Sequence, residues 1–208
     1  MEFQIEYRTQ TTVQLDLEKS LKIFEQNQKS NRRYLKIMRI FQDPSQPLDR
    51  EFQKLFNGFY RVRRGTDWQE ACYHMMEMHR TDPSVTFPQL LNELTYHTGK
   101  VDFSFATKIL HTINPRMPIY DSVIATNLAL WNNYDGSVDR KMCRAIVIYD
   151  QLQQAYRQLQ TMPEMLQCVD AFSRRFPDFS NISTLKKIDF LLWSNRCLLY
   201  TSPSPRDR

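Results

Sequence analysis

The amino-acid sequence predicts an all-α protein, built as an orthogonal bundle of eight to ten helices. Only four glycines occur among 208 residues, and helix-forming residues are abundant. Apolar residues make up 41% of the chain and aromatic residues 12%, which indicates a globular protein with a substantial core. In most segments the apolar residues recur at spacings of three and four, which is typical of amphipathic helices. We therefore expect no strand and no internal repeat.

The N-terminal quarter is predicted to hold two helices and the start of a third. Residues 1–13 are polar and rich in Thr and Gln, so we expect an extended or disordered lead-in. A first amphipathic helix follows from Leu15 to about Asn27, and a short one spans Tyr34–Phe41. Prolines then break the pattern, and Asp49 is placed to cap the next helix, whose apolar face includes Phe52.

The remaining helices are predicted from their start and stop signals. Proline is favoured in the first turn of a helix, and glycine just after its end. The longest predicted helix carries one continuous apolar stripe, which indicates a packing surface rather than a cofactor site. The expected segments are Trp68–His79, Phe87 to Gly99, a helix stopped by Asn114-Pro115, one that starts at Asp121, Val138–Gln160, Met162 to Phe176, and one capped by Ser183.

The chain divides by composition into three parts. Residues 1–48 hold basic N-terminal helices, and residues 49–196 form the main helical domain. Residues 197–208, Cys-Leu-Leu-Tyr-Thr-Ser-Pro-Ser-Pro-Arg-Asp-Arg, resemble translated adaptor sequence, so we interpret them as a non-native read-through tail.

Positive charge is concentrated in one segment. The whole chain has a net charge of +5, whereas residues 29–64 carry ten Lys and Arg against three Asp and Glu, a local charge of +7. Such a segment suits a polyanion, although an ordinary solvated helix surface has a similar composition. The basic residues are Lys29, Arg32, Arg33, Lys36, Arg39, Arg50, Lys54, Arg61, Arg63 and Arg64.

The sequence lacks the signatures of several functional classes. The four cysteines are widely separated, so no iron–sulfur or zinc-ribbon motif is present. His74 and His79 are five residues apart, a spacing that does not place them on one helix face, so no metal site is expected. No cofactor motif, signal peptide or apolar run of membrane length occurs. We expect a cytoplasmic protein with reduced thiols and no membrane partner.

One stretch, Tyr96 to Leu128, combines polar turns with apolar helices. A helix ends at Gly99, a tight connection leads to a second helix, and a proline-bounded turn brings Asp121 to the start of a third. Lys100 and Lys108 are amines close to these turns. An amine and a carboxylate that face one cleft could attack an electron-poor sugar carbon. The alternatives are structural: Asp121 as a helix cap and Lys108 as a solvated helix residue.

This arrangement resembles the helix-hairpin-helix DNA glycosylases, in particular the 8-oxoguanine-glycosylase-like bacterial proteins. The similarity covers roughly residues 50–195. It rests on four segments, namely Ser104–Pro115, Pro118–Ser122, the upstream Phe56–Arg63 and the closing Ser183–Trp193. The resemblance implies an all-α fold, DNA as partner, no cofactor, and a base that is extruded from the duplex into a pocket.

The resemblance also implies roles for individual residues. Asp121 matches the catalytic aspartate, and Lys108, or else Lys100, matches the lysine that forms a Schiff base in members with lyase activity. Contacts to nucleic acid are expected from the hairpin and the basic segment, at Thr98, Gly99, Ser104, Arg61, Arg63 and Arg64. The hairpin has a single glycine where the family usually has Gly-x-Gly. A non-catalytic module that binds DNA or a protein is therefore the alternative.

Overall fold

The computed structural model describes residues 1–6, 10–130 and 135–195. These residues form ten α-helices, one short 3₁₀ turn and a two-stranded hairpin, which confirms the predicted all-α bundle. The predicted tail at 197–208 lies outside the described residues. The elements are β1 (Glu2–Glu6), β2 (Gln10–Gln14), α1 (Leu17–Gln26), α2 (Gln28–Gln42), α3 (Arg50–Tyr60), α4 (Thr66–Met78), α5 (Phe87–Thr98), α6 (Phe103–Ile113), α7 (Ser122–Asn127), α8 (Val138–Leu159), α9 (Pro163–Arg175), η1 (Pro177–Phe179) and α10 (Thr184–Ser194).

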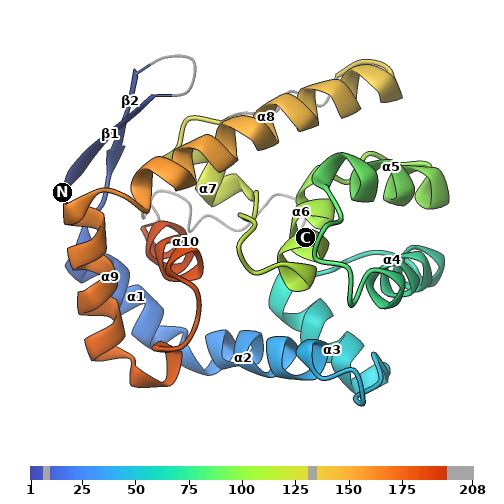
Figure 1. Cartoon of the computed structure of the whole chain (residues 1–208), viewed down its shortest axis with the longest axis horizontal. Coiled ribbons are helices and arrows are strands. Elements are labelled where there is room, and N and C mark those ends of the chain that lie inside the picture. Colours follow the sequence, from blue (N-terminus) through green and yellow to red (C-terminus); the bar gives the residue numbers. More distant parts are fainter. Residues whose placement is uncertain (7–9, 131–134, 196–208) are drawn as a thin grey trace, which may run out of the picture.

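Most of the helices form two groups, and two long helices, α2 and α8, run between these groups. The hairpin, α1, α9 and α10 lie at one end of the molecule, and α3, α4, α5 and α6 lie at the other (Figure 1). Helix α2 runs along one side between these groups, and α8 runs along the opposite side. Helix α1 packs on α10, and β1 on α8, so the two ends of the described chain share one core.

The N-terminal hairpin corrects the expectation that the chain contains no strand. Strands β1 and β2 pair antiparallel, with Phe3 opposite Val13. Phe3, Ile5 and Val13 are buried while their neighbours point outward. This alternation is the period of a half-buried strand. The segment contains few apolar residues among many Thr and Gln, so the pattern was too short to stand out.

Helix α2 is longer than the predicted Tyr34–Phe41, because its first turns are polar. Lys29, Arg32 and Arg33 are exposed, and the first buried residue of the helix is the polar Asn31. An amphipathic pattern therefore begins in the sequence only at Tyr34. The predicted caps are confirmed: Asp49 accepts hydrogen bonds from the backbone N–H groups of Glu51 and Phe52.

Aromatic packing joins α1 to the C-terminal helices. The ring of Phe24 on α1 is fully buried, and four other rings lie within 5.0 Å of it, centroid to centroid: Phe172, Phe176, Phe179 and Phe190. Edge-to-face geometry dominates these contacts, as the quadrupoles of aromatic rings favour. In the described part of the chain, no helix is both long enough and apolar enough to cross a membrane.

We expect Phe24→Ala to lower the free energy of unfolding by about 3–5 kcal/mol, because it removes a buried ring and leaves a cavity. Leu166→Ala on α9 is the matched control, since Leu166 is 38% exposed and should change stability by less than about 1 kcal/mol. Urea unfolding followed by circular dichroism measures both values. Equal losses in the two variants would contradict this account of the core.

Candidate active-site cleft

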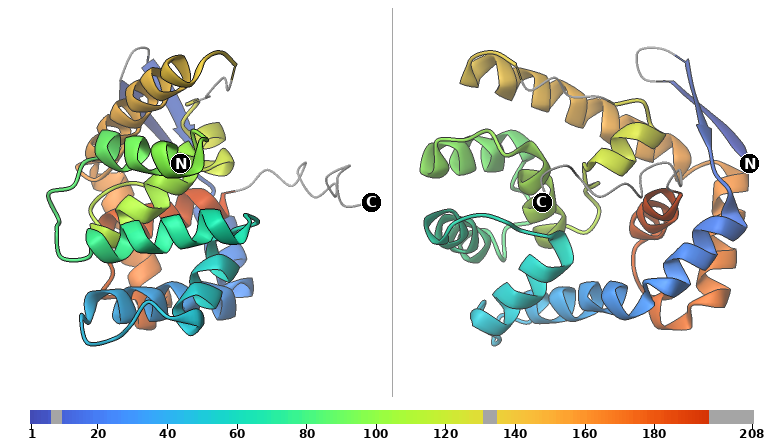
Figure 2. Two further views of the ribbon diagram at one scale, coloured as in Figure 1. Left: turned by 90° about the vertical axis from the view of Figure 1, so that its right-hand side faces the viewer. Right: turned by 180° about the vertical axis from the view of Figure 1, so that it is seen from behind.

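One large cleft, with a volume of about 1440 Å³, lies between the two helical groups. Its walls come from the hairpin, the starts of α1 and α2, the end of α3, and parts of α6, α7 and α10. These elements surround the middle of the molecule when it is seen from behind (Figure 2, right). Aromatic side chains line part of the cleft: Phe59, Tyr60, Phe190 and Trp193. The site therefore combines flat apolar surfaces with charged groups.

Lys108 on α6 is half-buried in the wall of this cleft. Its Nζ lies 4.6 Å from the ring centroid of Phe105 and 5.9 Å from that of Tyr60. Within the described residues the ammonium forms neither an ion pair nor a hydrogen bond. Burial lowers the pKa of Lys108, and the positive charge of Lys186 lowers it further, against the opposing effects of Asp121 and Asp189. The amine is therefore easier to deprotonate than an ordinary lysine.

Asp121 lines the same cleft and also caps α7. Its Oδ1 accepts hydrogen bonds from the backbone N–H groups of Val123 and Ile124, both at 2.9 Å. Its Oδ2 accepts none in the described part of the chain. Burial raises the pKa of Asp121, while the two capping hydrogen bonds and Lys108 oppose this rise. The cap therefore occupies one carboxylate oxygen and is compatible with a chemical role for Asp121, as expected from the sequence.

A second charged pair, Lys186 and Asp189 on α10, was not among the predicted site residues. Lys186 Nζ donates to Asp189 Oδ2 at 2.6 Å, and Tyr156 donates to the other oxygen, Oδ1, at 3.2 Å. Both charged side chains line the cleft, yet they are only 3% and 7% exposed. The available signal was Lys186 and Asp189, three residues apart in a mainly apolar segment that also contains Lys187. Together with Lys108 and Asp121 they form the cleft tetrad.

Uncharged polar groups lie behind the cleft tetrad. The hydroxyl of Tyr34 lies 3.0 Å from Nε2 of His111, and Nδ1 of His111 lies 2.6 Å from the carbonyl oxygen of Met117. Burial lowers the pKa of His111 to about 3, so the imidazole is neutral near pH 7. The hydroxyl of Tyr60 is buried without a hydrogen-bond partner in the described structure.

The predicted hairpin lies between α5 and α6, with Gly99 in the left-handed conformation (φ 66°) that glycine favours. Thr98 Oγ1 donates to the carbonyl of Leu94 and so closes the end of α5. Ser104 Oγ donates to the carbonyl of Tyr120, which ties α6 to the turn before Asp121. Lys100 is exposed and lies outside the cleft walls, so it is Lys108, and not Lys100, that lines the cleft together with Asp121.

The three predicted arginines occupy different settings. Arg61 is exposed at the cleft, in the left-handed conformation (φ 53°) that is uncommon for a residue with a side chain. Arg63 is exposed as well. Arg64 forms an ion pair with Asp102, which also accepts a hydrogen bond from Trp68 Nε1 at 2.8 Å. Arg64 and Trp68, through their shared partner Asp102, therefore connect the start of α4 to the hairpin before α6.

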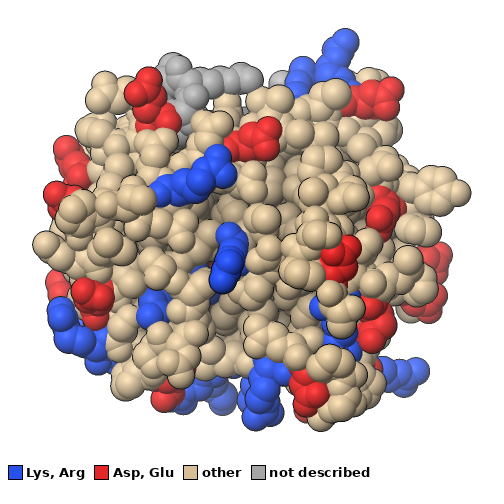
Figure 3. All heavy atoms as spheres, viewed as in Figure 1, with Lys and Arg blue, Asp and Glu red and all other residues tan. Residues whose placement is uncertain are grey.

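The basic residues of α2 and α3 are all exposed. On the face shown in Figure 3, Lys and Arg side chains gather along the edge formed by these two helices. Arg32 pairs with Asp178 at 2.7 Å, so part of this charge is neutralised by the C-terminal region.

Among the described residues, no three His, Cys, Asp or Glu side chains converge in a way that could hold a metal ion. No family model, curated protein or solved structure matches the chain. The geometry of the cleft is therefore the basis for assigning a function.

The buried His111 should make the protein sensitive to acid. Its pKa is lower in the folded state than the ordinary value near 6.5, so the unfolded chain takes up a proton first as pH falls. This stabilising effect is complete above pH 6.5 and is lost as pH falls towards 3. Between pH 7 and 5 the loss should be about 2 kcal/mol.

Urea unfolding at these two pH values, in the native protein and in His111→Gln, measures this contribution. The variant should lose about 2 kcal/mol less than the native protein over the same interval, since its amide does not titrate. Parallel losses in the two proteins would show that His111 is not held neutral by burial.

Proposed function

We propose that this protein is a DNA glycosylase-like enzyme that acts on a base extruded from the duplex and has lyase activity. One observation carries the proposal: the unpaired amine of Lys108 and the carboxylate of Asp121 line the same cleft. The depressed pKa of Lys108 supports it, because only a neutral amine is a nucleophile. The aromatic side chains of the cleft offer surfaces on which an extruded base can stack.

The proposed reaction uses the two groups in turn. The nitrogen of Lys108 attacks C1′ of the extruded nucleotide, and the glycosidic C–N bond breaks. The base leaves with the bonding electron pair and takes up a proton from solvent. The attached nitrogen then loses its own proton to Asp121. The C1′–O4′ bond breaks as the nitrogen lone pair forms the C=N bond of the Schiff base, and O4′ takes up the proton from Asp121. Before this transfer, the negative charge of Asp121 stabilises the positive charge that develops on the sugar.

DNA would approach across the exposed basic residues of α2 and α3 and the arginine at the cleft. Arg61 supports this orientation, since it is exposed at the cleft and forms no ion pair in the described structure. Contacts of this kind with phosphate depend strongly on salt concentration.

We expect borohydride to trap a covalent adduct between the protein and a duplex that contains one abasic site. Reduction converts the Schiff base at Lys108 into a stable amine bond. Lys108→Gln should abolish the adduct, whereas the matched control Lys100→Gln should retain it, because Lys100 lies outside the cleft. Denaturing gel electrophoresis detects the adduct, and peptide mass spectrometry identifies the modified lysine.

The result can overturn the proposal in two ways. An adduct on Lys100 would place the reactive site at the hairpin instead of in the cleft. A protein that binds the duplex in a salt-dependent manner but never forms an adduct would be a non-catalytic binding module. Binding that is absent or insensitive to salt would remove DNA as the partner.

Asp121→Asn should lose base release by a factor of at least about 100, because the amide can neither accept the proton nor stabilise positive charge. Its side-chain oxygen can still cap α7, so the free energy of unfolding should change by less than about 1 kcal/mol. Base release from oxidised, alkylated or deaminated DNA is measured by mass spectrometry of the free bases. Full release by a folded Asp121→Asn protein would exclude Asp121 from the reaction.

A further inference from the structure

The cleft tetrad contains more charge than the proposed reaction uses. Lys108 and Asp121 suffice for nucleophilic attack and proton transfer, yet Lys186 and Asp189 line the same cleft from α10. Burying an ion pair usually costs as much desolvation energy as the pair returns, so an apolar pair would serve the core equally well. Stability alone therefore does not account for the charged pair Lys186–Asp189 in the cleft wall.

The two lysines lie against neighbouring aromatic rings. The Nζ of Lys108 is 5.9 Å from the ring centroid of Tyr60, and the Nζ of Lys186 is 5.9 Å from that of Phe59. The centroids of Phe59 and Tyr60 are 4.8 Å apart. Lys186 is further enclosed by Tyr34 at 4.8 Å and Phe190 at 4.5 Å. Because these rings exclude water, the two ammonium groups interact more strongly than they would at the surface.

The pair on α10 is held in a fixed position. The ammonium of Lys186 is bonded to Asp189, and Tyr156 on α8 donates to the second oxygen of that carboxylate. The ammonium of Lys186 on α10 and the carboxyl group of Asp121 at the start of α7 therefore line the same cleft as Lys108. By contrast, Lys108 has no partner in the described structure that would favour its charged form through a direct hydrogen bond.

We propose that Lys186, held by Asp189, is a positioning residue that keeps the Lys108 amine in its neutral, nucleophilic form. This inference rests on the proposed role of Lys108 and adds a residue that acts through it. Burial is the main cause of the lowered pKa of Lys108, and Lys186 adds to it by repelling the proton. Asp121 and Asp189 attract the proton, and Asp189 also anchors Lys186. Neither residue needs to touch the substrate.

The other charged and titratable groups around Lys108 do not change charge near neutral pH. Burial raises the pKa of the three surrounding tyrosines, and it keeps His111 neutral. The guanidinium groups at the end of α3 and next to Phe105 stay positive. These groups are Tyr34 on α2, Tyr60 and Arg61 at the end of α3, Arg64 before α4, His111 on α6 and Tyr156 on α8.

The test measures the pH at which Lys108 becomes reactive, without any DNA. Folded protein is labelled with a trace of acetic anhydride at pH values from 6 to 11, and mass spectrometry quantifies the acetylated Lys108 peptide. The midpoint of this curve reports deprotonation of Lys108. Because no nucleic acid is involved, the test can fail while borohydride trapping succeeds, and the reverse is equally true.

We expect two of the variants to shift the midpoint of the Lys108 labelling curve in opposite directions. Lys186→Met removes the repelling charge, so the midpoint should rise, and a rise of one pH unit lowers labelling of Lys108 at pH 7.5 about tenfold. Asp189→Asn removes an attracting charge, so the midpoint should fall. Lys186→Arg keeps the charge and should retain the native midpoint. A general loosening of the cleft would instead raise the midpoint in all three variants, because it would expose Lys108 to water.

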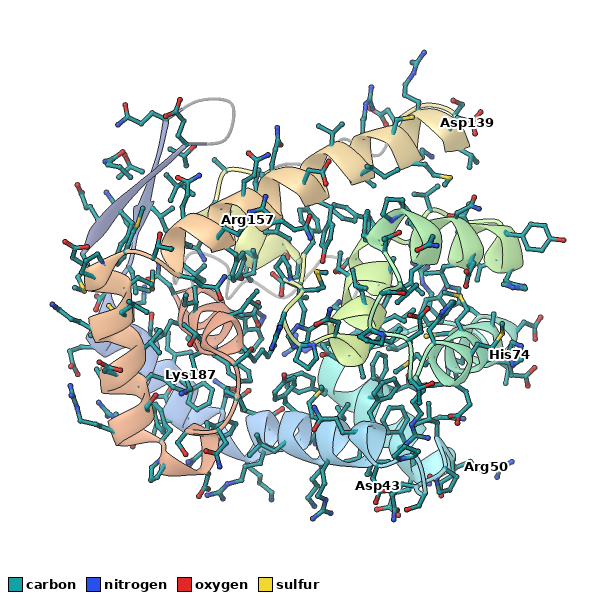
Figure 4. The ribbon with its side chains drawn as sticks, in the orientation of Figure 1. Asp43, Arg50, His74, Asp139, Arg157 and Lys187 are labelled. Atoms are coloured by element: carbon teal, nitrogen blue, oxygen red, sulfur yellow. The ribbon has the colours of Figure 1, made fainter. Side chains whose placement is uncertain are left out.

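Lys187→Met provides the matched control. Lys187 is the next residue on α10, on the side towards α9 (Figure 4), and its Nζ donates to the carbonyl of Ser180 at 2.6 Å. It is 8% exposed but does not line the cleft. This variant should leave the midpoint unchanged. An unchanged midpoint in folded Lys186→Met overturns the inference. If that variant does not fold, a midpoint that rises or stays constant in Asp189→Asn overturns it equally.

Discussion

Helix α10 is buried on nearly all sides, and this burial determines how its charged side chains are paired. It packs against α1, α7 and α9, and nearly every residue from Leu185 to Leu192 is inaccessible to solvent. A buried charge without a partner is strongly unfavourable, so the charged residues of this helix must find partners inside the protein. Lys186 finds Asp189 on its own helix, and Lys187 finds the carbonyl of Ser180. The cleft therefore lies beside a helix whose charged side chains are held by partners within the protein.

The contrast between Lys108 and Lys186 in the cleft follows from the elements that carry them. Lys186 is three residues from Asp189 on one helix, a spacing that places both side chains on the same face. Lys108 lies on α6, and its neighbours are Phe105 and Thr112 on the same helix and Tyr60 on α3. In the described structure no carboxylate is close enough to Lys108 for an ion pair. The same low dielectric that strengthens the first pair makes protonation of the second amine unfavourable. Lys186 is thus held by an ion pair, whereas Lys108 is the amine with the lowered pKa.

The sequence was informative wherever local chemistry decides the structure. Asp49 and Ser183 start helices because their side chains satisfy backbone N–H groups, and such caps can be read without knowledge of the fold. The hairpin β1–β2 was missed because it has few apolar residues and packs on α8, which is distant in sequence. The first turns of α2 were missed because they are polar and mostly exposed. Lys108 and Asp121 line one cleft, and the family role expected for them stays a prediction. The spacing of Lys186 and Asp189 is visible in the sequence, but their burial in the cleft wall depends on how α10 packs.

Asp121 shows why a helix cap can also serve a reactive site. A cap uses one carboxylate oxygen, and here Oδ1 accepts both N–H groups of α7. These hydrogen bonds favour the charged form and fix the orientation of the carboxylate, whereas burial and Asp189 favour the neutral form. The opposing effects bring the proton affinity of Asp121 closer to that of the neighbouring amine, whose own pKa is lowered. In the reaction proposed for this cleft, the rigid cap would hold the proton acceptor in a fixed position relative to the amine.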